Sequence, residues 1–377
     1  MKLYTIVLTH YNQMEYIEES LDSVFIQNYP NIELLITDDA SKNFDENKVT
    51  EYIKKHKKNN IKNFKILVNE KNIGTTKTLN NAIKASTGEY IQFFAADDAL
   101  YDKNVISNFV KAFNKSGEKV VTAQCFMCGT TLDKINEKYV PTKYALKLNK
   151  EPVIEQFYEL CNTCIYGSGA TAYDKKVFDE LGYFSEKYKL VEDWSYYLLL
   201  TLNGYRVFYS NFNAFLHRTG GVSHYENKDL PPHVKQYQKD ILTIYEDLVF
   251  PNIGEMNIKK KADLYYKYKL HVEYFSKQNP EIKDKNNVVK DFIKKNPKLK
   301  MYMFINKIKT YMHTQLFHTL IYILIFTTLI DLIITWLFNL KYIYVLIHIS
   351  SLILAYISIK ILKTIKRRLK NGKQNND

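Results

Sequence analysis

The stretch Gly88–Asp98, GEYIQFFAADD, decides the fold that we predict for this chain. Its apolar and aromatic part, Glu89–Phe94, is too short for a helix and indicates a buried β-strand. Gly88 marks the end of the helix before it, and Asp97 and Asp98 follow at the carboxyl end of the strand. In an open α/β sheet, ligands bind in the crevice beyond the carboxyl ends of the strands.

The Asp97-Asp98 pair has two interpretations. Adjacent carboxylates repel each other unless a cation lies between them and an anionic ligand, which indicates a divalent metal and a diphosphate. Alternatively, an Asp before the sequence DKNVISNFVKAF would cap the helix that follows. The pair alone favours neither interpretation.

Strands and helices alternate with short connections on both sides of this stretch. Further strands are expected at Leu3–Thr9, Ile32–Thr37, Phe64–Val68 and Val120–Phe126. This alternation predicts an α/β fold with a Rossmann-like, mainly parallel sheet that is covered on both faces. Three strand ends then carry polar side chains to one edge, namely Thr9 with Tyr11, Asp38 with Asp39, and Asp97 with Asp98. Their convergence favours a nucleotide site with a metal over capping alone.

The segments TIVLTHYNQ, ELLITDDAS, NIGTTKTLNNAIKASTGEYIQFFAADD and LVEDW together resemble the family 2 glycosyltransferases of the GT-A fold, over roughly residues 1–225. The resemblance implies an inverting enzyme that uses a nucleotide-diphosphate sugar and a divalent cation, Mg or Mn. It also implies that Thr9 and Tyr11 line the nucleotide pocket, and that Asp39, with Asp38 beside it, binds the base.

The same resemblance places Lys77 and Asn80 in the segment that flanks the donor, and Asp97 and Asp98 in the metal-binding acidic motif. The family often has a further Asp where this chain has Ala95. This departure leaves open which of the two remaining acids is the direct metal ligand.

Glu192 and Asp193 begin an apolar helix, and the resemblance assigns Asp193 as the catalytic base. An inverting transfer needs such a base to take the proton of the acceptor hydroxyl. Alternatively, both acids merely stabilise the helix N-terminus. Arg218 follows the next expected strand, Arg206–Tyr209, and is expected either to bind the diphosphate or to be a solvated residue of a surface turn.

Four cysteines form two pairs with zinc-ribbon spacing, Cys125 with Cys128 and Cys161 with Cys164. The gap between the pairs is longer than the usual one. Reduced, partly buried thiols in a cytosolic domain are therefore expected.

The charge balance and two apolar runs predict a membrane protein. The chain has 53 Lys and Arg against 40 Asp and Glu, and no recognisable nucleic-acid motif accompanies the basic residues. The runs Leu316–Phe338 and Tyr342–Leu362 are each long enough to cross a bilayer, and both have basic flanks. The positive-inside rule then puts the catalytic domain and both termini in the cytoplasm.

The expected organisation is a GT-A catalytic domain at 1–225, a helical linker at 226–314, a transmembrane hairpin at 315–362 and a basic tail at 363–377. Within the linker, helices are expected near Val234–Phe250 and Lys259–Ser276.

The predicted function is sugar transfer to a bacterial cell-surface glycan precursor of the capsule, O-antigen or teichoic-acid type, at the cytoplasmic face of the plasma membrane. The expected partners are a nucleotide-sugar donor, a glycan or lipid-linked acceptor and membrane lipid, but no nucleic acid. Two alternatives remain: a polyprenyl-phosphate glycosyltransferase, and a non-catalytic nucleotide-sugar-binding scaffold, for which Ala95 is the supporting feature.

Overall fold

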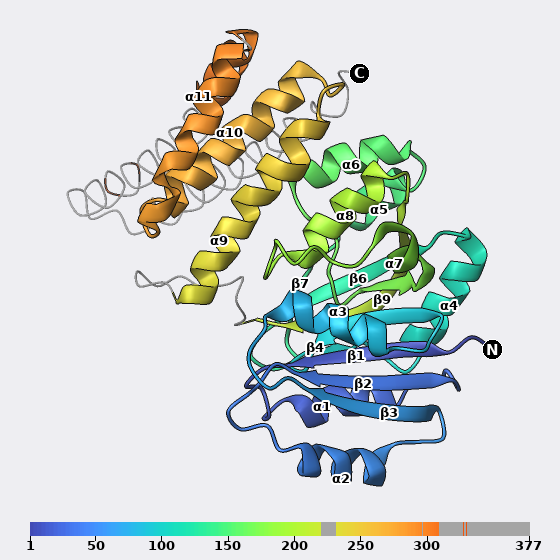
Figure 1. The fold of residues 1–377 in the computed structure, drawn as a ribbon. Coiled ribbons are helices and arrows are strands. Elements are labelled where there is room, and N and C mark those ends of the chain that lie inside the picture. The colour runs from blue at the N-terminus through green and yellow to red at the C-terminus, as the bar shows by residue number, and fades with distance from the viewer. Residues whose placement is uncertain (220–230, 296, 309–326, 328, 330–377) are drawn as a thin grey trace, which may run out of the picture. The chain divides into compact units, whose positions relative to one another are not determined.

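The structure is a computed structural model that describes residues 1–219, 231–295, 297–308, 327 and 329. The chain divides into two compact units, Met1–Leu299 and Lys300–Asp377, and every element named below belongs to the first (Figure 1). The domain boundaries expected at 225 and 314 stay predictions.

Four parallel strands form the first half of the sheet. They lie in the order β3-β2-β1-β4, with bounds Tyr4–His10 for β1, Ile32–Asp38 for β2, Ile61–Val68 for β3 and Tyr90–Ala95 for β4. In this register His10 lies beside Asp38, and Thr9 lies beside Ala95. The carboxyl ends of the strands therefore meet at one edge, as the sequence predicts.

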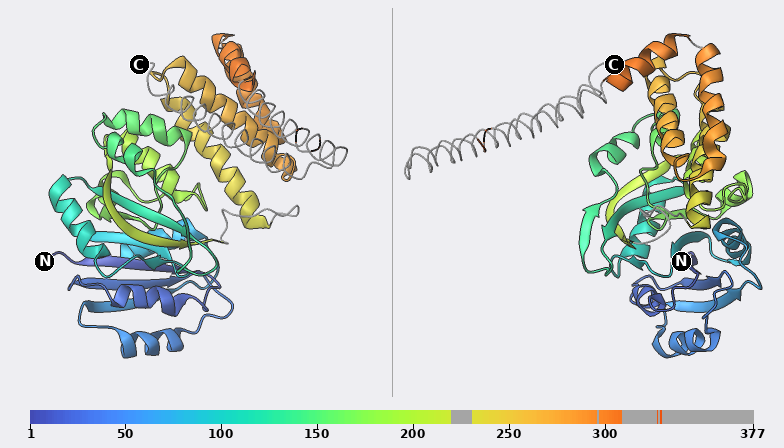
Figure 2. Two further views of the ribbon diagram at one scale, coloured as in Figure 1. Left: turned by 180° about the vertical axis from the view of Figure 1, so that it is seen from behind. Right: turned by 90° about the vertical axis from the view of Figure 1, so that its left-hand side faces the viewer.

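Helices cover both faces of these strands (Figure 2). Alternate residues of β1, Tyr4, Ile6 and Leu8, are fully buried in a core shared with one set of helices. That set consists of α1 (Ile17–Phe25), α2 (Glu46–His56) and α4 (Val105–Ser116). Helix α3 (Thr75–Ala85) contacts β1 and β2 from the opposite face.

The second half of the sheet corrects the expectation of a mainly parallel arrangement, because the sheet is mixed. The additional strands are β5 (Ala99–Leu100), β6 (Val120–Cys128), β7 (Ile135–Lys138), β8 (Thr171–Asp174) and β9 (Val207–Arg218). Strand β8 is antiparallel to both β4 and β6, whereas β9 is parallel to β6 and antiparallel to β5. Four residues are too few for β8 to show a strand period in the sequence.

The remaining helices all follow β7 in the chain. They are α5 (Thr142–Leu148), α6 (Val153–Asn162), α7 (Lys176–Leu181), α8 (Glu192–Leu202), α9 (Pro232–Ile244), α10 (Ile258–Phe275) and α11 (Asn286–Lys295). A π-helical turn, Tyr245–Val249, and a 3-10 turn, Phe250–Asn252, follow α9, and another 3-10 segment, Pro280–Lys285, precedes α11. Helices α9 and α10 match the two helices expected after residue 225.

Gly88 has a packing role that the sequence does not reveal. Helix α3 already ends at Ala85, so Gly88 is not its stop. A Cβ at Gly88 would lie 2.4 Å from Thr5 Oγ1 and 2.9 Å from the carbonyl oxygen of Leu3. Only glycine therefore lets the chain approach β1 closely enough to start β4 beside it.

The predicted membrane anchor is contradicted. The runs 316–338 and 342–362 fall outside the described residues, apart from Thr327 and Leu329. Among the residues that the structure does describe, no helix combines the length and the apolar character needed to cross a bilayer. The prediction of a two-span protein at the cytoplasmic face of a membrane is withdrawn on this finding.

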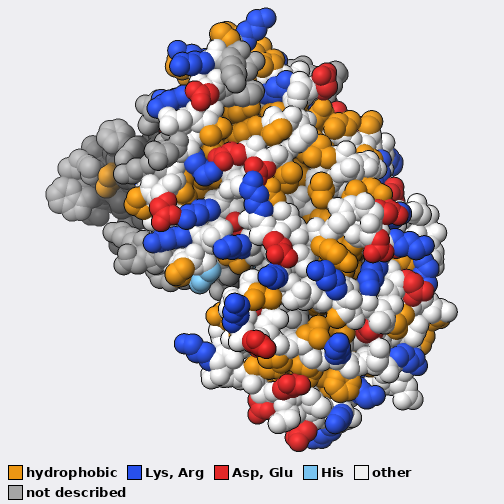
Figure 3. All heavy atoms as spheres, viewed as in Figure 1, with side chains coloured by type: hydrophobic (Ala, Val, Ile, Leu, Met, Phe, Trp, Pro, Cys, Tyr) orange, Lys and Arg blue, Asp and Glu red, His pale blue; other side chains and the backbone are white. Residues whose placement is uncertain are grey.

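Charged side chains are intermixed on the face shown in Figure 3. Lys and Arg side chains lie scattered there among Asp, Glu and apolar side chains. On this face the basic side chains are thus spread out instead of being gathered in one stripe.

Candidate active site

The ends of β1 and β4 are tied together at the edge where the sequence predicts a ligand. The Thr9 hydroxyl donates to the carbonyl of Phe94 at 3.3 Å, and the backbone N–H of Ala96 donates to the carbonyl of Thr9 at 2.8 Å. Tyr11 follows with half of its side chain exposed. Both predicted pocket residues therefore lie at the expected edge, with Tyr11 open to a ligand.

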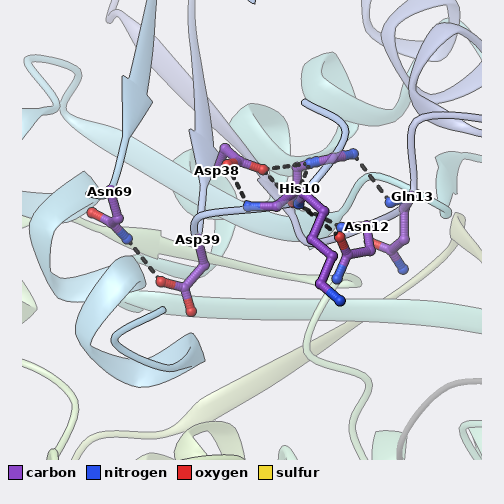
Figure 4. A network of polar contacts seen from close by, with 8 residues as sticks. His10, Asn12, Gln13, Asp38, Asp39 and Asn69 are labelled. Carbon is purple, nitrogen blue, oxygen red and sulfur yellow. Dashed lines mark hydrogen bonds and ion pairs between the residues drawn. The ribbon is translucent and has the colours of Figure 1, made fainter. Parts of the chain in front are cut away.

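Asp38 belongs to a buried polar network (Figure 4). Its Oδ1 lies 2.7 Å from His10 Nδ1 and accepts a 2.5 Å hydrogen bond from the Ser41 hydroxyl. The Ser41 hydroxyl in turn accepts from the N–H of Asn12 at 2.8 Å. Asn12 and Ala40 both have left-handed backbones, with φ of 56° and 60°. The network thus holds two tight turns. Sequence reasoning missed its members His10 and Ser41: Ser41 lies three residues after Asp38, whereas only tertiary contact brings His10 to Asp38.

Asp39 holds the loop that leads into α3. Its carboxylate accepts from the N–H of Ile73 at 2.8 Å, the N–H of Gly74 at 2.9 Å and the side-chain amide of Asn69 at 3.0 Å. Gly74 has a φ of 88°, which favours glycine, and it precedes the helix without a side-chain cap. The side chain predicted to bind the base therefore also fixes the start of α3.

Lys77 and Asn80 have different surroundings on α3. Lys77 is exposed in the first turn, whereas Asn80 is 3% exposed and donates to the carbonyl of Phe184 at 2.9 Å. One turn earlier, the Thr76 hydroxyl donates to the carbonyl of Tyr188 at 2.5 Å. Asn80 therefore anchors the loop before α8, and only Lys77 is free to reach a donor.

The acidic turn after β4 is fastened to the end of β9. Both oxygens of the Asp98 carboxylate lie close to His217 Nδ1, at 3.0 and 3.1 Å, and Oδ1 accepts from the N–H of Arg218 at 2.8 Å. The Asp98 carbonyl accepts a short hydrogen bond from the Ser20 hydroxyl. These bonds set the Asp97-Asp98 turn rigidly at the carboxyl edge of the sheet.

Arg218 is buried, with 6% of its surface exposed, and spans three elements. Its Nε donates to the carbonyl of Asp97 at 2.9 Å, and its Nη2 donates to Glu19 at 2.5 Å. Its Nη1 donates to the carbonyl of Thr130, and the Tyr16 ring lies 4.2 Å from the guanidinium carbon. In this conformation Arg218, the residue predicted to bind the diphosphate, instead holds the backbone of the acidic turn.

Asp97 and Asp98 are the two carboxylates of this turn that could hold a divalent cation. Burial, reinforced by the negative charge of Asp98, raises the pKa of Asp97 to about 6. A bound cation would relieve this charge, and carboxylate oxygens are the ligands that Mg and Mn prefer. Within the described part of the chain, no group of three or more His, Cys, Asp and Glu side chains is arranged to hold a metal alone. Two carboxylates that share a cation with a ligand diphosphate do not need a third.

Glu192 and Asp193 lie at the first turn of α8 in a largely apolar setting. Burial, followed by the charge of Asp193 and then that of Asp240, raises the pKa of Glu192 to about 8. Burial also raises the pKa of Asp193, while the Trp194 N–H donates to its carboxylate at 2.6 Å and lowers that pKa. The two acids titrate as a coupled pair, in which burial and the charge of Asp193 favour the protonated form of Glu192.

Cys125, Cys164 and Tyr139 connect the surroundings of the acidic turn with those of this pair. Burial, and after it the charge of Asp98, raises the pKa of Cys125, and burial, and after it the charge of Asp193, raises the pKa of Cys164. Tyr139 links the two cysteines, because its N–H donates to the carbonyl of Cys125 at 2.9 Å and its hydroxyl to that of Cys164 at 3.1 Å. Tyr139 thus joins a cysteine that feels the charge of Asp98 to a cysteine that feels the charge of Asp193. All four cysteines are free thiols.

Comparison with known proteins identifies part of the chain. Residues 5–182 match the family model for glycosyl transferase family 2. An uncharacterized glycosyltransferase of Rickettsia typhi is 28% identical over 192 residues, which are 51% of this chain and 56% of that protein. A dolichyl N-acetyl-alpha-D-glucosaminyl phosphate 3-beta-D-2,3-diacetamido-2,3-dideoxy-beta-D-glucuronosyltransferase of Methanococcus voltae is 26% identical over 63% of this chain and 71% of its own. Residues 5–182 are thus similar in sequence to the glycosyl transferase family 2 proteins.

The fold has a solved counterpart. The mannosyltransferase PcManGT from Pyrobaculum calidifontis, in complex with GDP-Man and Mn2+, superposes with a TM-score of 0.51 at 14% identity. The match covers 82% of this chain and 86% of that one, and shows a shared GT-A-like fold. The chain spans little more than half the length of the Rickettsia typhi relative. Helices α8 and α9 lie beyond the family match, so the roles of their residues depend on the geometry.

Proposed function

We propose, from the premise that residues 5–182 form a family 2 glycosyltransferase domain, that this chain transfers a sugar from a nucleotide-diphosphate donor to an acceptor hydroxyl with inversion. The observation that supports the proposal is that Asp98 acts electrostatically on Cys125 and Asp193 acts on Cys164, and that Tyr139 is hydrogen-bonded to the backbone of both cysteines. In this proposal Asp98 serves the leaving diphosphate, and Asp193 serves the attacking hydroxyl.

The donor occupies the carboxyl edge of the sheet in this proposal. Thr9 and Tyr11 line the nucleotide pocket, Asp39 binds the base while Asp38 supports its turn, and Lys77 is placed to contact the donor. The fold shared with a mannosyltransferase that holds GDP-Man supports this class of donor. Asn80 contributes indirectly, through the loop that it anchors.

Asp97 and Asp98 would hold a divalent cation, Mg or Mn. When bound, the cation neutralises the charge that develops on the departing diphosphate. The turn that carries both carboxylates is kept in place by His217 and Arg218. A rearranged Arg218 that reached the diphosphate itself would first have to leave Glu19.

Asp193 is the base that takes the proton of the acceptor hydroxyl as the oxygen attacks the anomeric carbon and the nucleoside diphosphate leaves. Glu192 stays protonated at neutral pH, because burial and the Asp193 charge raise its pKa to about 8. Its neutral form leaves the negative charge of the pair on Asp193, where the proton is accepted.

The acceptor in this proposal is a hydroxyl of a cell-surface glycan precursor, of the capsule, O-antigen or teichoic-acid type. The Methanococcus voltae relative is named for transfer to a lipid-linked sugar phosphate, which supports a lipid-linked form of the acceptor.

Release of nucleoside diphosphate from a panel of nucleotide sugars with Mn2+ tests the proposal. Asp193→Asn should bind the donor normally and lower release by about 10²–10⁴-fold, the usual contribution of a positioned base. Asp179→Asn, an exposed carboxylate on α7, is the matched control and should keep full activity. Normal turnover by Asp193→Asn rejects the base assignment, and binding without release from any donor favours the non-catalytic scaffold.

A further inference from the structure

The loop 183–191, which joins α7 to α8, is held from two sides. On one side, α3 binds its backbone, since Asn80 donates to the carbonyl of Phe184 and Thr76 to that of Tyr188. Residues Glu192 and Asp193 follow the loop directly. Any movement of the loop would therefore carry both acids with it.

The other side of the loop is held by Asp240 of α9. Its carboxylate is 2% exposed and accepts from the backbone N–H of Leu190 at 2.8 Å. The side-chain amide of Gln236, one turn earlier on α9, donates to the other carboxylate oxygen at 2.7 Å. Asp240 is thus a buried, oriented acceptor that holds the backbone two residues before Glu192.

The continuation of α9 also packs on the start of α8. The ring of Tyr245 lies 5.4 Å from that of Trp194 in an edge-to-face arrangement. The indole N–H of Trp194 donates to the carbonyl of Leu160 at 2.8 Å. The residue next to Asp193 is therefore fixed by α6 on one side and by the turn after α9 on the other.

We infer that Asp240 is a positioning residue for the catalytic base: by holding the Leu190 N–H, it fixes the start of α8 and aims the Asp193 carboxylate at the acceptor hydroxyl. This inference rests on the proposed function, in which Asp193 is that base. A hydrogen bond from a backbone N–H to a buried carboxylate is among the stronger kinds, and a base displaced by about 1 Å can cost about 10²-fold in rate. The proximity of Asp240 to the acid pair is also reflected in its contribution to the raised pKa of Glu192.

Asp247 offers a matched control. It is a second carboxylate of the same helical segment and contacts the same loop, through the Tyr188 hydroxyl at 3.0 Å and the Lys187 ammonium at 2.5 Å. Both contacts are with side chains that precede the Leu190 backbone. Loss of Asp247 therefore removes a loop contact without releasing the backbone at the start of α8.

The kinetic experiment compares Asp240→Ala, Asp240→Asn and Asp247→Ala in the full chain, with UDP-GlcNAc and GDP-Man as the donor probes. Asp240→Ala should lower kcat by about 10–100-fold with the donor KM unchanged. Asp240→Asn should restore kcat to within about threefold, since its amide oxygen still accepts from Leu190. Asp247→Ala should remain within about twofold of the parent protein. Equal effects of the two alanine variants would overturn the inference.

Hydrogen–deuterium exchange decides the question even when neither donor is turned over. The amide of Leu190 should exchange faster in Asp240→Ala than in the parent, and at the parent rate in Asp247→Ala. In a Trp336→Phe background Trp194 is the one tryptophan left, so its emission reports directly on the start of α8. The wavelength of the Trp194 emission maximum should shift in Asp240→Ala but not in Asp247→Ala. Unchanged exchange at Leu190 rejects the inference.

Failure of the Asp193 base assignment can be distinguished from failure of the positioning role of Asp240. If Asp193→Asn keeps its activity, the base assignment fails whatever the Asp240 variants do. If Asp193→Asn is inactive while Asp240→Ala turns over normally, only the positioning role of Asp240 fails.

Discussion

The Asp39 carboxylate accepts a hydrogen bond from the backbone N–H of Gly74 at 2.9 Å, and so joins the end of β2 to the start of α3. Helix α3 in turn holds the loop before α8 through Thr76 and Asn80. Asp39, which is expected to bind the nucleotide base, is therefore also connected through α3 to the loop that precedes Asp193, the expected catalytic base. Variants of Asp39 should separate these two roles.

Asp39→Asn should keep the fold and weaken nucleotide binding even without metal. The amide oxygen still accepts from the N–H groups of Ile73 or Gly74, but the charged acceptor for the base is lost. Asp39→Ala should weaken binding equally and also lower the free energy of unfolding by about 1–3 kcal/mol, because two N–H groups lose their acceptor. Titration calorimetry with UDP and GDP, alongside urea unfolding, checks both. Full nucleotide affinity in Asp39→Asn contradicts the base-binding role.

Removal of the cation should abolish donor turnover if Asp97 and Asp98 hold it. EDTA should stop release of nucleoside diphosphate, and added Mn2+ should restore it. Asp97→Asn and Asp98→Asn should each weaken Mn2+-dependent donor binding by at least about tenfold, since even outer partners of metal ligands cost about 10–100-fold.

Asp102→Asn is the control for this experiment. Asp102 lies just beyond the acidic turn and accepts from the N–H of Asn104 at 2.7 Å, so its loss should leave the dependence on Mn2+ as it was. Activity that is insensitive to EDTA removes the metal from the proposal.

The Arg218 contacts predict a structural effect that Lys cannot rescue. Arg218→Ala leaves the carbonyls of Asp97 and Thr130 without their donor and should lower the free energy of unfolding by about 1–3 kcal/mol. Arg218→Lys should recover little, because one ammonium cannot replace three guanidinium donors that point in different directions. Glu19→Gln removes only the charge of the half-exposed partner and should cost at most about 1 kcal/mol. Urea unfolding measures the three variants, and equally small effects of all three would show that Arg218 is a solvated surface residue.

The strand ends were predictable from the sequence, because short apolar runs followed by polar residues specify parallel strands locally. Thr9, Asp39 and Asp97 lie at the expected edge for this reason. The sequence could not show which hydrogen-bond partner each of these side chains has. Asp38 is satisfied by His10, which lies 28 residues away, and nothing in either segment alone signals that contact.

The second half of the sheet and α9 were harder to predict for a related reason. Strand β8 is short, and its antiparallel direction depends on its neighbours β4 and β6, not on its own residues. From the sequence alone, Asp240 is expected to be an exposed polar residue of a surface helix, whereas in the structure it is buried and accepts a hydrogen bond from the Leu190 N–H. The two apolar runs show the reverse error, because length and hydropathy alone led to a membrane assignment that the described helices do not support.

The raised pKa of Glu192 predicts how stability depends on pH. In the unfolded chain Glu192 loses its proton near pH 4.5, whereas in the folded chain burial and the charges of Asp193 and Asp240 keep it protonated up to about pH 8. Between these values the folded state binds more protons than the unfolded state, so the free energy of unfolding falls as the pH rises. Tyr173 of β8 also lies near the acid pair, but its pKa is raised well above this range, so it stays neutral throughout.

Glu192→Gln cannot ionise and should lack this loss of stability. Its free energy of unfolding should exceed that of the parent protein by an amount that widens from pH 5 to pH 8.5 by more than about 1 kcal/mol, since one pKa unit corresponds to about 1.4 kcal/mol. The variant should also remain active at pH 7, because glutamine resembles the protonated acid that the parent carries there. Urea unfolding at several pH values measures the difference, with the exposed Glu186→Gln of the same loop as the control that should follow the parent curve. A constant difference in the free energy of unfolding between Glu192→Gln and the parent across this pH range would show that Glu192 ionises normally in the folded protein. Inactivity of Glu192→Gln at pH 7 would move the role of catalytic base from Asp193 to Glu192.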